Sequence, residues 1–385
     1  MTSETAPMVR VSWRLFRVPF VAAAQTSRAT LAVREGIIVS LETADGATGI
    51  GEASPLPDFE GGELGEVAKA VEQMAPSLLG RGAAAVWDGP ELEAAVSGPS
   101  QRVARAGIET ALADVLAQNQ HLPMWKWLAQ RSGLDVTGPF TIQANALADG
   151  SSPEAVGASV RAAVQLGYRT VKLKVGVDSA SDPLRVAAAR EAGPDVGLRL
   201  DANGAWDETT AITVLNACAP HRISLCEQPL DPCREDVIEA TARLRKQATI
   251  PLALDESCRT RESLNHILAA GAADAIVIKP MFTGLKDALE MVRIARGAGL
   301  PAIVTTTFDT GIGTAMAAHL AALLPAPRPA CGLATLARLE HSLILGNEFV
   351  DGPSMHPPGG AGLGVRLDET AMERYASGIF GSVAL

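Results

Sequence analysis

The feature that most constrains the fold is a charged residue that recurs at the ends of short apolar segments. The recurring residues are Lys174, Asp201, Glu227, Asp255 and Lys279, which follow one another at intervals of 24 to 28 residues. One strand followed by one helix takes about that many residues, so each charged side chain falls at the same height of a successive strand. In a parallel (β/α) barrel that height is the C-terminal mouth, where catalytic groups collect. The spacing therefore predicts a barrel with these side chains gathered at one end.

Strand-length apolar segments alternate with helix-length amphipathic segments from about residue 139 onwards. The predicted strands are 140–147, 170–174, 197–201, 223–227, 252–255, 275–279, 302–306 and 330–335. Helical patterns, for example over 153–166, 207–219 and 285–296, fill the gaps. Eight such units favour a closed parallel barrel, with an open doubly wound sheet as the alternative.

The first part of the chain has a different pattern, a β meander followed by helices. Strand patterns cover 11–18 and 36–42, and helical patterns cover 64–79, 83–96 and 100–131. Asp45-Gly46 is a hairpin signal after the second strand. We expect an α+β capping domain over 1–135, joined by the loop-rich segment 336–385, and a barrel over 136–335.

The composition is typical of a folded protein that acts on small molecules. Hydrophobic residues make up 47% of the chain, and the formal net charge is -10. An acidic surface does not attract nucleic acid or anionic membranes. No run of 18 apolar residues and no signal-peptide pattern occurs. We therefore expect a cytoplasmic protein with a small-molecule carboxylate as its partner and with no nucleic-acid or membrane partner, while a homo-oligomeric state stays open.

Three of the recurring residues are acids that would repel one another at the mouth of a barrel. Singly, each has a simpler explanation, since an Asp after a strand is commonly a helix N-cap and Glu227 precedes a Pro-containing turn. Together, Asp201, Glu227 and Asp255 need a cation between them. An all-oxygen donor set favours Mg²⁺ over Zn²⁺, with Mn²⁺ as an alternative.

Three lysines near this acidic cluster indicate proton-transfer chemistry. Lys172 and Lys174 lie two residues apart on one strand, so both face the barrel interior. A neighbouring ammonium group and a divalent cation lower the pKa of a lysine, which makes it a usable base near neutral pH. Lys279 would approach from the other side of the mouth. This concentration of positive charge suits removal of a proton alpha to a carboxylate.

The ordered motifs resemble those of the enolase superfamily, in particular its muconate-lactonizing-enzyme subgroup. The matching segments are Val171-Lys172-Leu173-Lys174, Asp201-Ala202-Asn203, Glu227-Gln228-Pro229, Asp255-Glu256-Ser257, Ile278-Lys279-Pro280 and, near the N-terminus, Arg34-Glu35-Gly36 and Gly51-Glu52-Ala53. The resemblance implies a (β/α)7β-type modified TIM barrel with an N-terminal α+β capping domain completed by the C-terminal segment. It also implies that Asp201, Glu227 and Asp255 bind Mg²⁺ and that Lys174 is the general base. Lys279 would lie across the substrate, and Lys172 would orient near the bound carboxylate or tune Lys174.

The segments 306–313 and 330–336 resemble o-succinylbenzoate synthases within this subgroup. That activity is a lyase reaction of menaquinone synthesis, the dehydration of 2-succinyl-6-hydroxy-2,4-cyclohexadiene-1-carboxylate to 2-succinylbenzoate. Arg199 resembles an arginine of some synthases, and a strand-face salt bridge is an equally good explanation. The predicted substrate contacts are Arg199, Thr307, Asp309, Gly311 and Gly332. The helix expected to begin near Thr310 would offer its free N–H groups to an anion, or it would follow an ordinary glycine-rich turn.

Other functions stay open. An N-succinylamino acid racemase would use Lys174 and Lys279 as opposed bases. A dipeptide epimerase fits less well. Such enzymes usually carry an acidic Asp-x-Asp on the eighth strand, and the eighth predicted strand of this chain, 330–335, has no acidic residue. A non-catalytic barrel that binds a dicarboxylate is the alternative from another class. Residues 20–28 and 52–61 are expected to form loops that close over the mouth. Phe20 and Phe59 would line these loops, and ordinary packing within the capping domain is an equally good explanation of the two rings.

Overall fold

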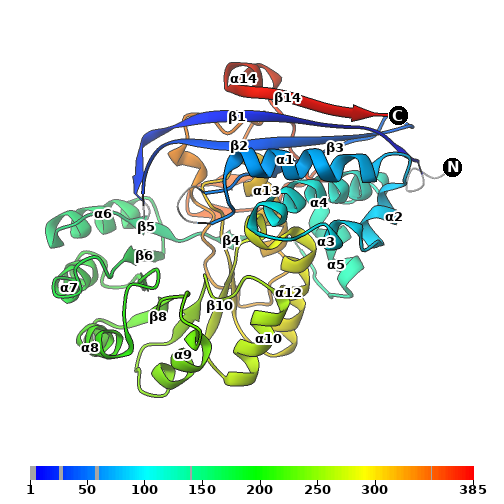
Figure 1. The fold of residues 1–385 in the computed structure, drawn as a ribbon. Helices are drawn as coiled ribbons and strands as arrows, with labels where there is room; N and C mark the ends of the chain where they lie inside the picture. Colours follow the sequence, from blue (N-terminus) through cyan, green and yellow to red (C-terminus); the bar gives the residue numbers. More distant parts are fainter. Residues whose placement is uncertain (1–5, 26–28, 57–59, 139–140, 348) are drawn as a thin grey trace.

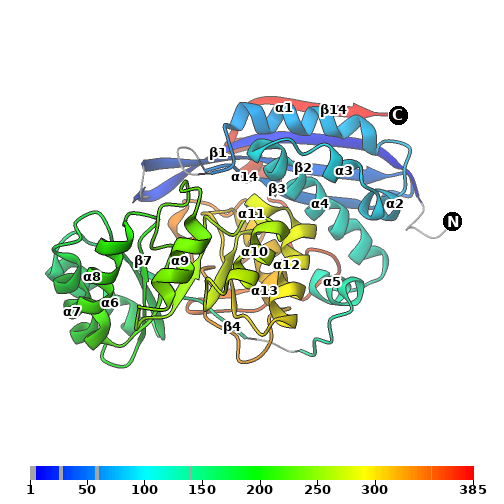
Figure 2. The ribbon, with the colours of Figure 1, turned by 60° about the horizontal axis from the view of Figure 1, so that its bottom comes forward.

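Two sheets organise the chain, and one lies across the end of the other (Figures 1 and 2). The computed structural model describes residues 6–25, 29–56, 60–138, 141–347 and 349–385. A four-stranded antiparallel sheet has the order β14-β1-β2-β3, and a seven-stranded parallel sheet has the order β11-β10-β9-β8-β7-β6-β5. This is the expected combination of a capping domain and a curled parallel α/β sheet.

The capping sheet joins the two ends of the described chain. Its strands are β1 (Met8–Gln25), β2 (Thr30–Thr43), β3 (Thr48–Ala53) and β14 (Ala376–Ala384). The last strand pairs antiparallel with the first, as Arg10 opposite Ala384 shows. The C-terminal strand therefore completes the sheet that the N-terminal strands begin.

Helices of the capping domain form a layer beside this sheet, in which the first and fourth helices contact its strands and the fifth packs on the fourth and on helices of the barrel. They are α1 (Leu64–Met74), α2 (Ala83–Asp88), α3 (Glu91–Ala94), α4 (Pro99–Asn119) and α5 (Met124–Ser132). Strand β3 approaches α4 so closely that a Cβ atom at Gly51 would lie 2.0 Å from the carbonyl oxygen of Gly107. Glycine is needed there because no side chain fits between strand and helix.

The segment 100–131 forms two helices where the sequence pattern predicts one. The break falls between Asn119 and Met124, where His121 has a φ of 54°. Pro123 then lies immediately before α5, and the residue before a proline is restricted to extended conformations. Apolar periodicity continues across this turn, which is why the pattern does not reveal it.

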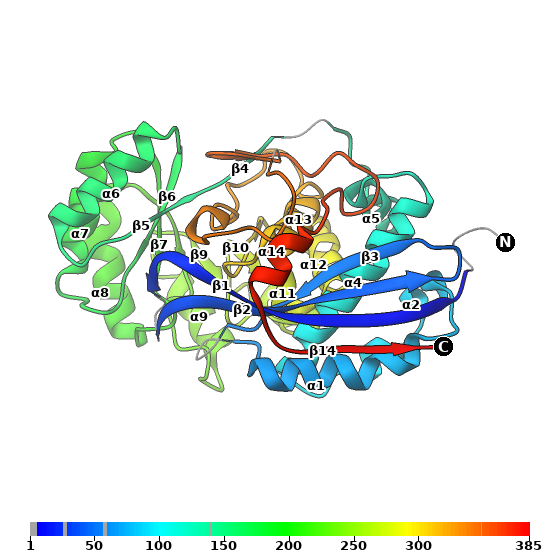
Figure 3. The same ribbon diagram turned by 90° about the horizontal axis from the view of Figure 1, so that it is seen from above.

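The parallel sheet curls into the barrel (Figures 1 and 3). Its strands are β5 (Ala146–Ala148), β6 (Thr170–Lys174), β7 (Gly197–Asp201), β8 (Ile223–Glu227), β9 (Leu252–Leu254), β10 (Ala275–Ile278) and β11 (Ala302–Val304). Lys174 pairs with Asp201, and Asp201 pairs with Glu227. The predicted equal height of these side chains is therefore the actual register of the sheet.

The first and eighth predicted strands differ from expectation. Between 140 and 148 the structure has two short strands, β4 (Ile142–Gln143) and β5. The segment 330–335 forms parallel bridges only at Cys331 and Gly332. Cys331 donates to the carbonyl of Gln143, and Gly332 donates to that of Val304, both through backbone N–H groups. These bridges connect the two edges of the seven-stranded sheet, so a minimal eighth element closes the ring.

In the described part of the barrel segment, eight α-helices surround the sheet. They are α6 (Pro153–Gln165), α7 (Asp182–Ala192), α8 (Glu208–Cys218), α9 (Val237–Arg245), α10 (Arg261–Ala270), α11 (Pro280–Thr283), α12 (Leu285–Gly297) and α13 (Gly311–Ala321). Inside the barrel, buried apolar side chains including Leu225, Val277 and Ile303 form a separate cluster. In the described part of the chain, no helix combines the length and apolarity needed to cross a bilayer.

The C-terminal segment divides between the capping sheet and a third, small sheet. β12 (Val350–Asp351) and β13 (Ser354–Met355) form a small sheet with β4 of the barrel segment. Only after α14 (Glu369–Arg374) does the chain enter the capping sheet. The bounds 1–135, 136–335 and 336–385 therefore stay a prediction.

Candidate active site

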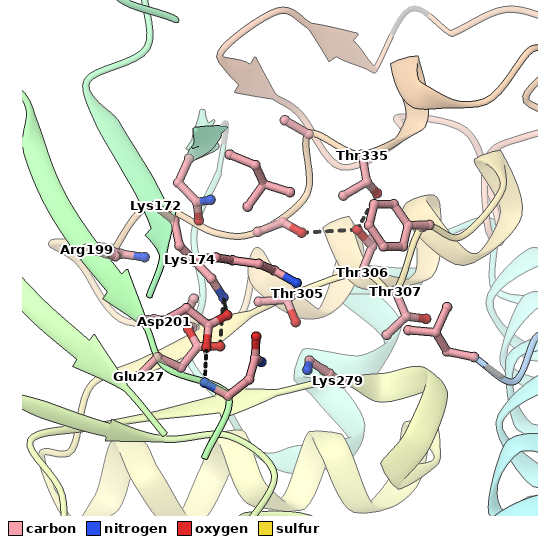
Figure 4. Close-up of a pocket in the computed structure, with 18 residues that line it drawn as sticks. Lys172, Lys174, Arg199, Asp201, Glu227, Lys279, Thr305, Thr306, Thr307 and Thr335 are labelled. Atoms are coloured by element: carbon pink, nitrogen blue, oxygen red, sulfur yellow. Dashed lines mark hydrogen bonds and ion pairs between the residues drawn. The ribbon is translucent and has the colours of Figure 1, made fainter. Parts of the chain in front are cut away.

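A cavity lies at the C-terminal ends of the barrel strands, with an empty volume of about 810 Å³ that includes its opening to solvent. Figure 4 shows the side chains that line it. Among the predicted site residues, those on the cavity are Lys172, Lys174, Arg199, Asp201, Glu227, Lys279, Thr307 and Gly332. They come from β6, β7 and β8, from the residues that follow β10 and β11, and from the segment that closes the ring, so the fold brings most of the predicted site together.

Lys172 lies between two of the predicted metal ligands. Its ammonium group is 2.8 Å from an oxygen of Asp201 and 2.7 Å from one of Glu227. Burial would lower the pKa of Lys172, but these carboxylates outweigh it and raise the pKa above its ordinary value. Lys172 is therefore a fixed cation.

Glu227 is enclosed by other acids as well as by Lys172. Burial raises its pKa to about 8, and the carboxylates of Asp201 and Asp255 act in the same direction. The cations that the chain supplies thus do not fully compensate the acids.

Asp255 is buried just beyond the end of β9 and does not line the cavity. One carboxylate oxygen is 2.5 Å from Lys279 Nζ, and the other accepts a hydrogen bond of 2.8 Å from Arg259. Burial would raise the pKa of Asp255, but Lys279 and Arg259 hold it below its usual range. The backbone of Asp255 is also fixed, because its N–H donates to the Gln228 side chain.

Lys174 extends into the cavity from the same strand as Lys172. Burial lowers its pKa below the ordinary value, and the ammonium groups of Lys172 and Lys279 act in the same direction against the opposing carboxylate of Asp201. The two lysines of one strand thus shift in opposite directions, because only Lys172 contacts two carboxylates.

Glu256 is a fourth acid of this cluster, beside the three predicted metal ligands. Asn203 donates to one of its oxygens at 3.1 Å. The other oxygen, Oε2, is buried and has no hydrogen-bond partner among the described residues. An unpaired buried carboxylate oxygen is costly, so this region is short of positive charge.

These residues fit a divalent cation in donor chemistry and in charge. Asp201, Glu227 and Asp255 offer only hard oxygen atoms, which Mg²⁺ prefers. Among the described residues, no three acidic, histidine or cysteine side chains already form a metal-binding group. Instead, Lys172, Lys279 and Arg259 are paired with the three acids.

Threonines form another part of the cavity wall. The side chains of Thr305, Thr306, Thr307 and Thr335 line it. Thr306 and Thr335 share a hydrogen bond of 2.7 Å between their hydroxyl groups. The hydroxyl of Thr305 is buried and has no partner among the described residues, so it can serve a ligand. Only Thr307 of this set was predicted to contact substrate.

Arg199 lies deeper in the barrel, level with Lys172 in the sheet register. Its guanidinium donates to the carbonyl of Ala330 at 2.7 Å, and no ion pair with a carboxylate is found for it in the described part of the chain. Burial lowers its pKa. The strand-face salt bridge considered for Arg199 is therefore absent among these residues, and a cation remains at the cavity wall.

Asp309 and Gly311 do not reach the cavity. Asp309 is fully buried, 3.6 Å from Arg34 of strand β2, and the side chain of Ile344 covers Gly311. The beginning of α13 already holds an anion, because Glu52 of strand β3 accepts from the N–H groups of Thr310 and Gly313. The predicted anion site at this helix is thus filled by the protein itself.

The capping domain and the segment after β11 add apolar walls. Leu56 and Phe308 line the cavity. Phe308 has a φ of 61°, which is uncommon for a bulky residue, and Phe20 packs on its ring edge-to-face at 5.4 Å. Phe20 therefore supports the wall through Phe308, while Phe59 lies outside the described residues.

Comparison with known families agrees with this geometry. A family model described as "Mandelate racemase / muconate lactonizing enzyme, N-terminal domain" matches residues 6–129, and one described as "Enolase C-terminal domain-like" matches residues 155–371. The chain belongs to the enolase superfamily.

Superfamily relatives with three different activities are similar to this chain. An aromatic dipeptide epimerase of Herpetosiphon aurantiacus is 33% identical over 300 residues, 76% of this chain and 80% of that protein. Muconate cycloisomerase 1 of Rhodococcus opacus is 29% identical, with 96% and 98% covered. An o-succinylbenzoate synthase of Thermobifida fusca is 37% identical over 207 residues, 52% of this chain and 62% of that protein.

A solved structure of the superfamily shows the same overall arrangement. The dipeptide epimerase of Enterococcus faecalis V583, complexed with Mg and the dipeptide L-Leu-L-Tyr, aligns with a TM-score of 0.83 at 27% identity, covering 94% of this chain and 99% of that one. At the level that these relatives share, the chain is an isomerase or lyase of the muconate-lactonizing-enzyme subgroup.

Proposed function

We propose that this protein is an o-succinylbenzoate synthase, which dehydrates 2-succinyl-6-hydroxy-2,4-cyclohexadiene-1-carboxylate to 2-succinylbenzoate in menaquinone synthesis. The substrate is a dianion with one carboxylate on the ring and one on the succinyl chain. The proposal includes a cytoplasmic location, as expected from the sequence.

The observation that carries the proposal is the charge distribution of the cavity. Three cationic side chains line it, namely Lys172, Arg199 and Lys279, together with the proposed base Lys174, against two carboxylates, Asp201 and Glu227. Both carboxylates belong to the proposed metal set, so a bound cation makes the cavity more positive still. Such a site favours a dianionic substrate.

The cavity wall formed by the ring-closing segment also favours a dianionic substrate over a dipeptide. Gly332 and Ala334 line the cavity there, and neither carries a charge. A dipeptide has an ammonium group that needs a carboxylate partner when it is buried. The described cavity offers none outside the metal set, so a dipeptide is a poorer fit.

The metal site is part of the proposal. Asp201, Glu227 and Asp255 would hold Mg²⁺, or Mn²⁺ as the alternative, which supplies stabilisation of negative charge developing on the substrate carboxylate. Lys172, already paired with Asp201 and Glu227, would turn its charge to the ring carboxylate and keep Lys174 deprotonated.

The lysines would carry out the proton transfers. Lys174 removes the proton alpha to the ring carboxylate, and its ammonium form then returns that proton to the departing hydroxide, so that water leaves and the ring becomes aromatic. Lys279 lies against the π face of the anion as a cation–π partner. Arg199, whose guanidinium forms no ion pair with a carboxylate among the described residues, would bind the succinyl carboxylate.

A second candidate is an N-succinylamino acid racemase. It is favoured by one observation, that Lys174 and Lys279 reach the same cavity from different strands (Figure 4). Its substrates are also dianions, so the charge of the cavity accepts them equally well.

The test is a direct assay of the metal-loaded protein with the cyclohexadiene substrate beside N-succinylamino acids, a dipeptide panel and muconate, which is also a dicarboxylate. We expect fastest turnover of the cyclohexadiene. Exchange of the alpha proton with D₂O from both enantiomers of an N-succinylamino acid, at a higher kcat/KM, would favour the racemase. Binding of dicarboxylates without turnover of any of them would point to the non-catalytic alternative.

A further inference from the structure

Arg259 connects the proposed metal site to the capping domain. It follows β9 by a few residues and is buried. Its Nη1 donates to the carboxylate of Asp255 at 2.8 Å and to the carbonyl of the same residue at 2.6 Å. Its Nε lies 2.6 Å from both oxygens of Glu60, which belongs to the segment between β3 and α1. One guanidinium is thus shared between acids of the two domains.

The backbone around Glu60 is tightly placed. Leu56 and Glu60 exchange two backbone hydrogen bonds, of 2.8 and 3.0 Å, and Leu56 lines the cavity. Gly61 follows with a φ of +96°, and a Cβ atom there would lie 2.9 Å from Val103 and 3.1 Å from Pro55. The position of Glu60 therefore also fixes the position of Leu56 at the cavity.

The charge of Glu60 governs how Arg259 acts on Asp255. The guanidinium is always protonated, so it competes with any other cation for the carboxylate of Asp255. Its Nη2 is buried and has no partner among the described residues. If Glu60 were neutral, that donor would turn to Asp255, and the full charge of Arg259 would oppose metal binding.

We propose that Glu60 and Arg259 are a positioning pair that couples the capping domain to the metal site. Glu60 holds the Nε of Arg259 and offsets its charge, so that only Nη1 contacts the carboxylate of Asp255, and Arg259 in turn holds Glu60, and with it Leu56, at the cavity. This inference rests on the proposed assignment of Asp255 as a metal ligand, and it does not depend on which dianion is the substrate.

The test is the Mg²⁺ affinity of the full-length protein, measured by isothermal titration calorimetry on Glu60→Gln. We expect affinity to fall by about tenfold or more, the range typical of residues that orient metal ligands. The matched control is Glu63→Gln, which removes the same charge three residues further along the chain. The side chain of Glu63 is exposed and makes no capping hydrogen bond to α1. It should leave the affinity within about twofold of the wild type, because an exposed charge is screened.

A steady-state assay completes the test. Glu60→Gln should raise KM by a larger factor than it lowers kcat, because Leu56 loses its support. Equal Mg²⁺ affinity of a folded Glu60→Gln variant and the wild type would overturn the inference. Should Glu60→Gln not fold, Arg259→Lys decides instead. It keeps the charge but cannot bridge both acids, so it must weaken Mg²⁺ binding by a similar factor, and unchanged affinity would overturn the pairing.

The proposed function fails in a different way. A wild type that binds Mg²⁺ but turns over no dianion would refute the synthase. The pairing of Glu60 with Arg259 would then still be judged by the Mg²⁺ affinities of the Glu60→Gln and Arg259→Lys variants. A wild type that binds no Mg²⁺ would refute both.

Discussion

At the scale of single residues, two lysines of one strand have different roles because of what each contacts. Lys172 touches the carboxylates of Asp201 and Glu227, which keep it protonated. The pKa of Lys174 is lowered by burial and by neighbouring ammonium groups. The sequence predicts that both face inward, but the side-chain contacts determine which is the cation and which is the base.

We expect Lys174→Ala to lower kcat by about a thousandfold, the contribution of a well-placed general base. Mg²⁺ affinity should stay within a few-fold, since no ion pair joins Lys174 to the proposed ligands among the described residues. Turnover and calorimetric titration of the same preparation measure the two effects. Retained turnover would remove Lys174 from the role of base.

Asp255→Asn should give the opposite pattern. Loss of the carboxylate charge removes one acidic partner from each of Lys279 and Arg259 and replaces a carboxylate oxygen that would bind the cation, so Mg²⁺ affinity should fall by at least about tenfold. The same titration measures it, and an affinity equal to that of the wild type would discredit Asp255 as a ligand.

At the scale of elements, helix α13 shows how an internal residue can be specified by neighbours far away in sequence. His319 is fully buried on this helix. Its Nδ1 accepts from the backbone N–H of Trp125, and its Nε2 pairs with the carbonyl of Leu363. The ring is therefore neutral, and burial lowers its pKa to about 4.

This histidine should make stability depend on pH. Unfolded His has a pKa of about 6.5, so between that value and about 4 the unfolded chain binds a proton that the folded chain excludes. The contribution is fully present above pH 6.5 and is lost as the pH falls. At pH 5 the loss amounts to about 2 kcal/mol of the unfolding free energy.

The measurement is urea unfolding at pH 7 and pH 5 of the wild type and of His319→Gln. Asp114 and Asp309, whose pKa values burial raises to about 6, act in the opposite sense, so only the difference between the two proteins isolates His319. The variant should lose less stability on acidification than the wild type. Identical losses would show that His319 titrates normally.

At the scale of the whole molecule, buried polar contacts join the capping domain to the barrel. Glu52 of β3 accepts from Ser54 and from Thr310 and Gly313 at the beginning of α13. Arg34 of β2 donates to the carbonyls of Ser54 and Phe308. These contacts fix the cavity wall that contains Phe308 against the capping sheet.

Glu52→Gln should therefore destabilise the protein by about 3 kcal/mol, because its amide would direct N–H groups at other donors in a buried site. Denaturant unfolding measures the loss. Glu35→Gln, on the same sheet but partly exposed beside Arg17, is the matched control and should change stability by less than about 1 kcal/mol. Equal stability of the two variants would mean that the Glu52 contacts do not hold the domains together.

The residue types and spacing of the sequence determined the parallel sheet, its register and the inward direction of Lys172, Lys174, Asp201 and Glu227. The two-residue alternation within a strand and the length of one strand–helix unit suffice for these features. Alternate side chains of a strand point to the same face, and a constant unit length places the charged residues at the same level of successive strands. The sequence also predicts that the acids need a cation, since that follows from their charge.

Only the tertiary structure decided which groups meet from distant parts of the chain. Glu52 fills the beginning of α13 where an anion from the substrate was expected, Glu256 presents an oxygen that no described residue pairs, and Arg259 joins Asp255 to Glu60. No local pattern encodes these contacts, because a buried side chain takes its partner, its pKa and its accessibility from elements that pack against it after the chain has folded.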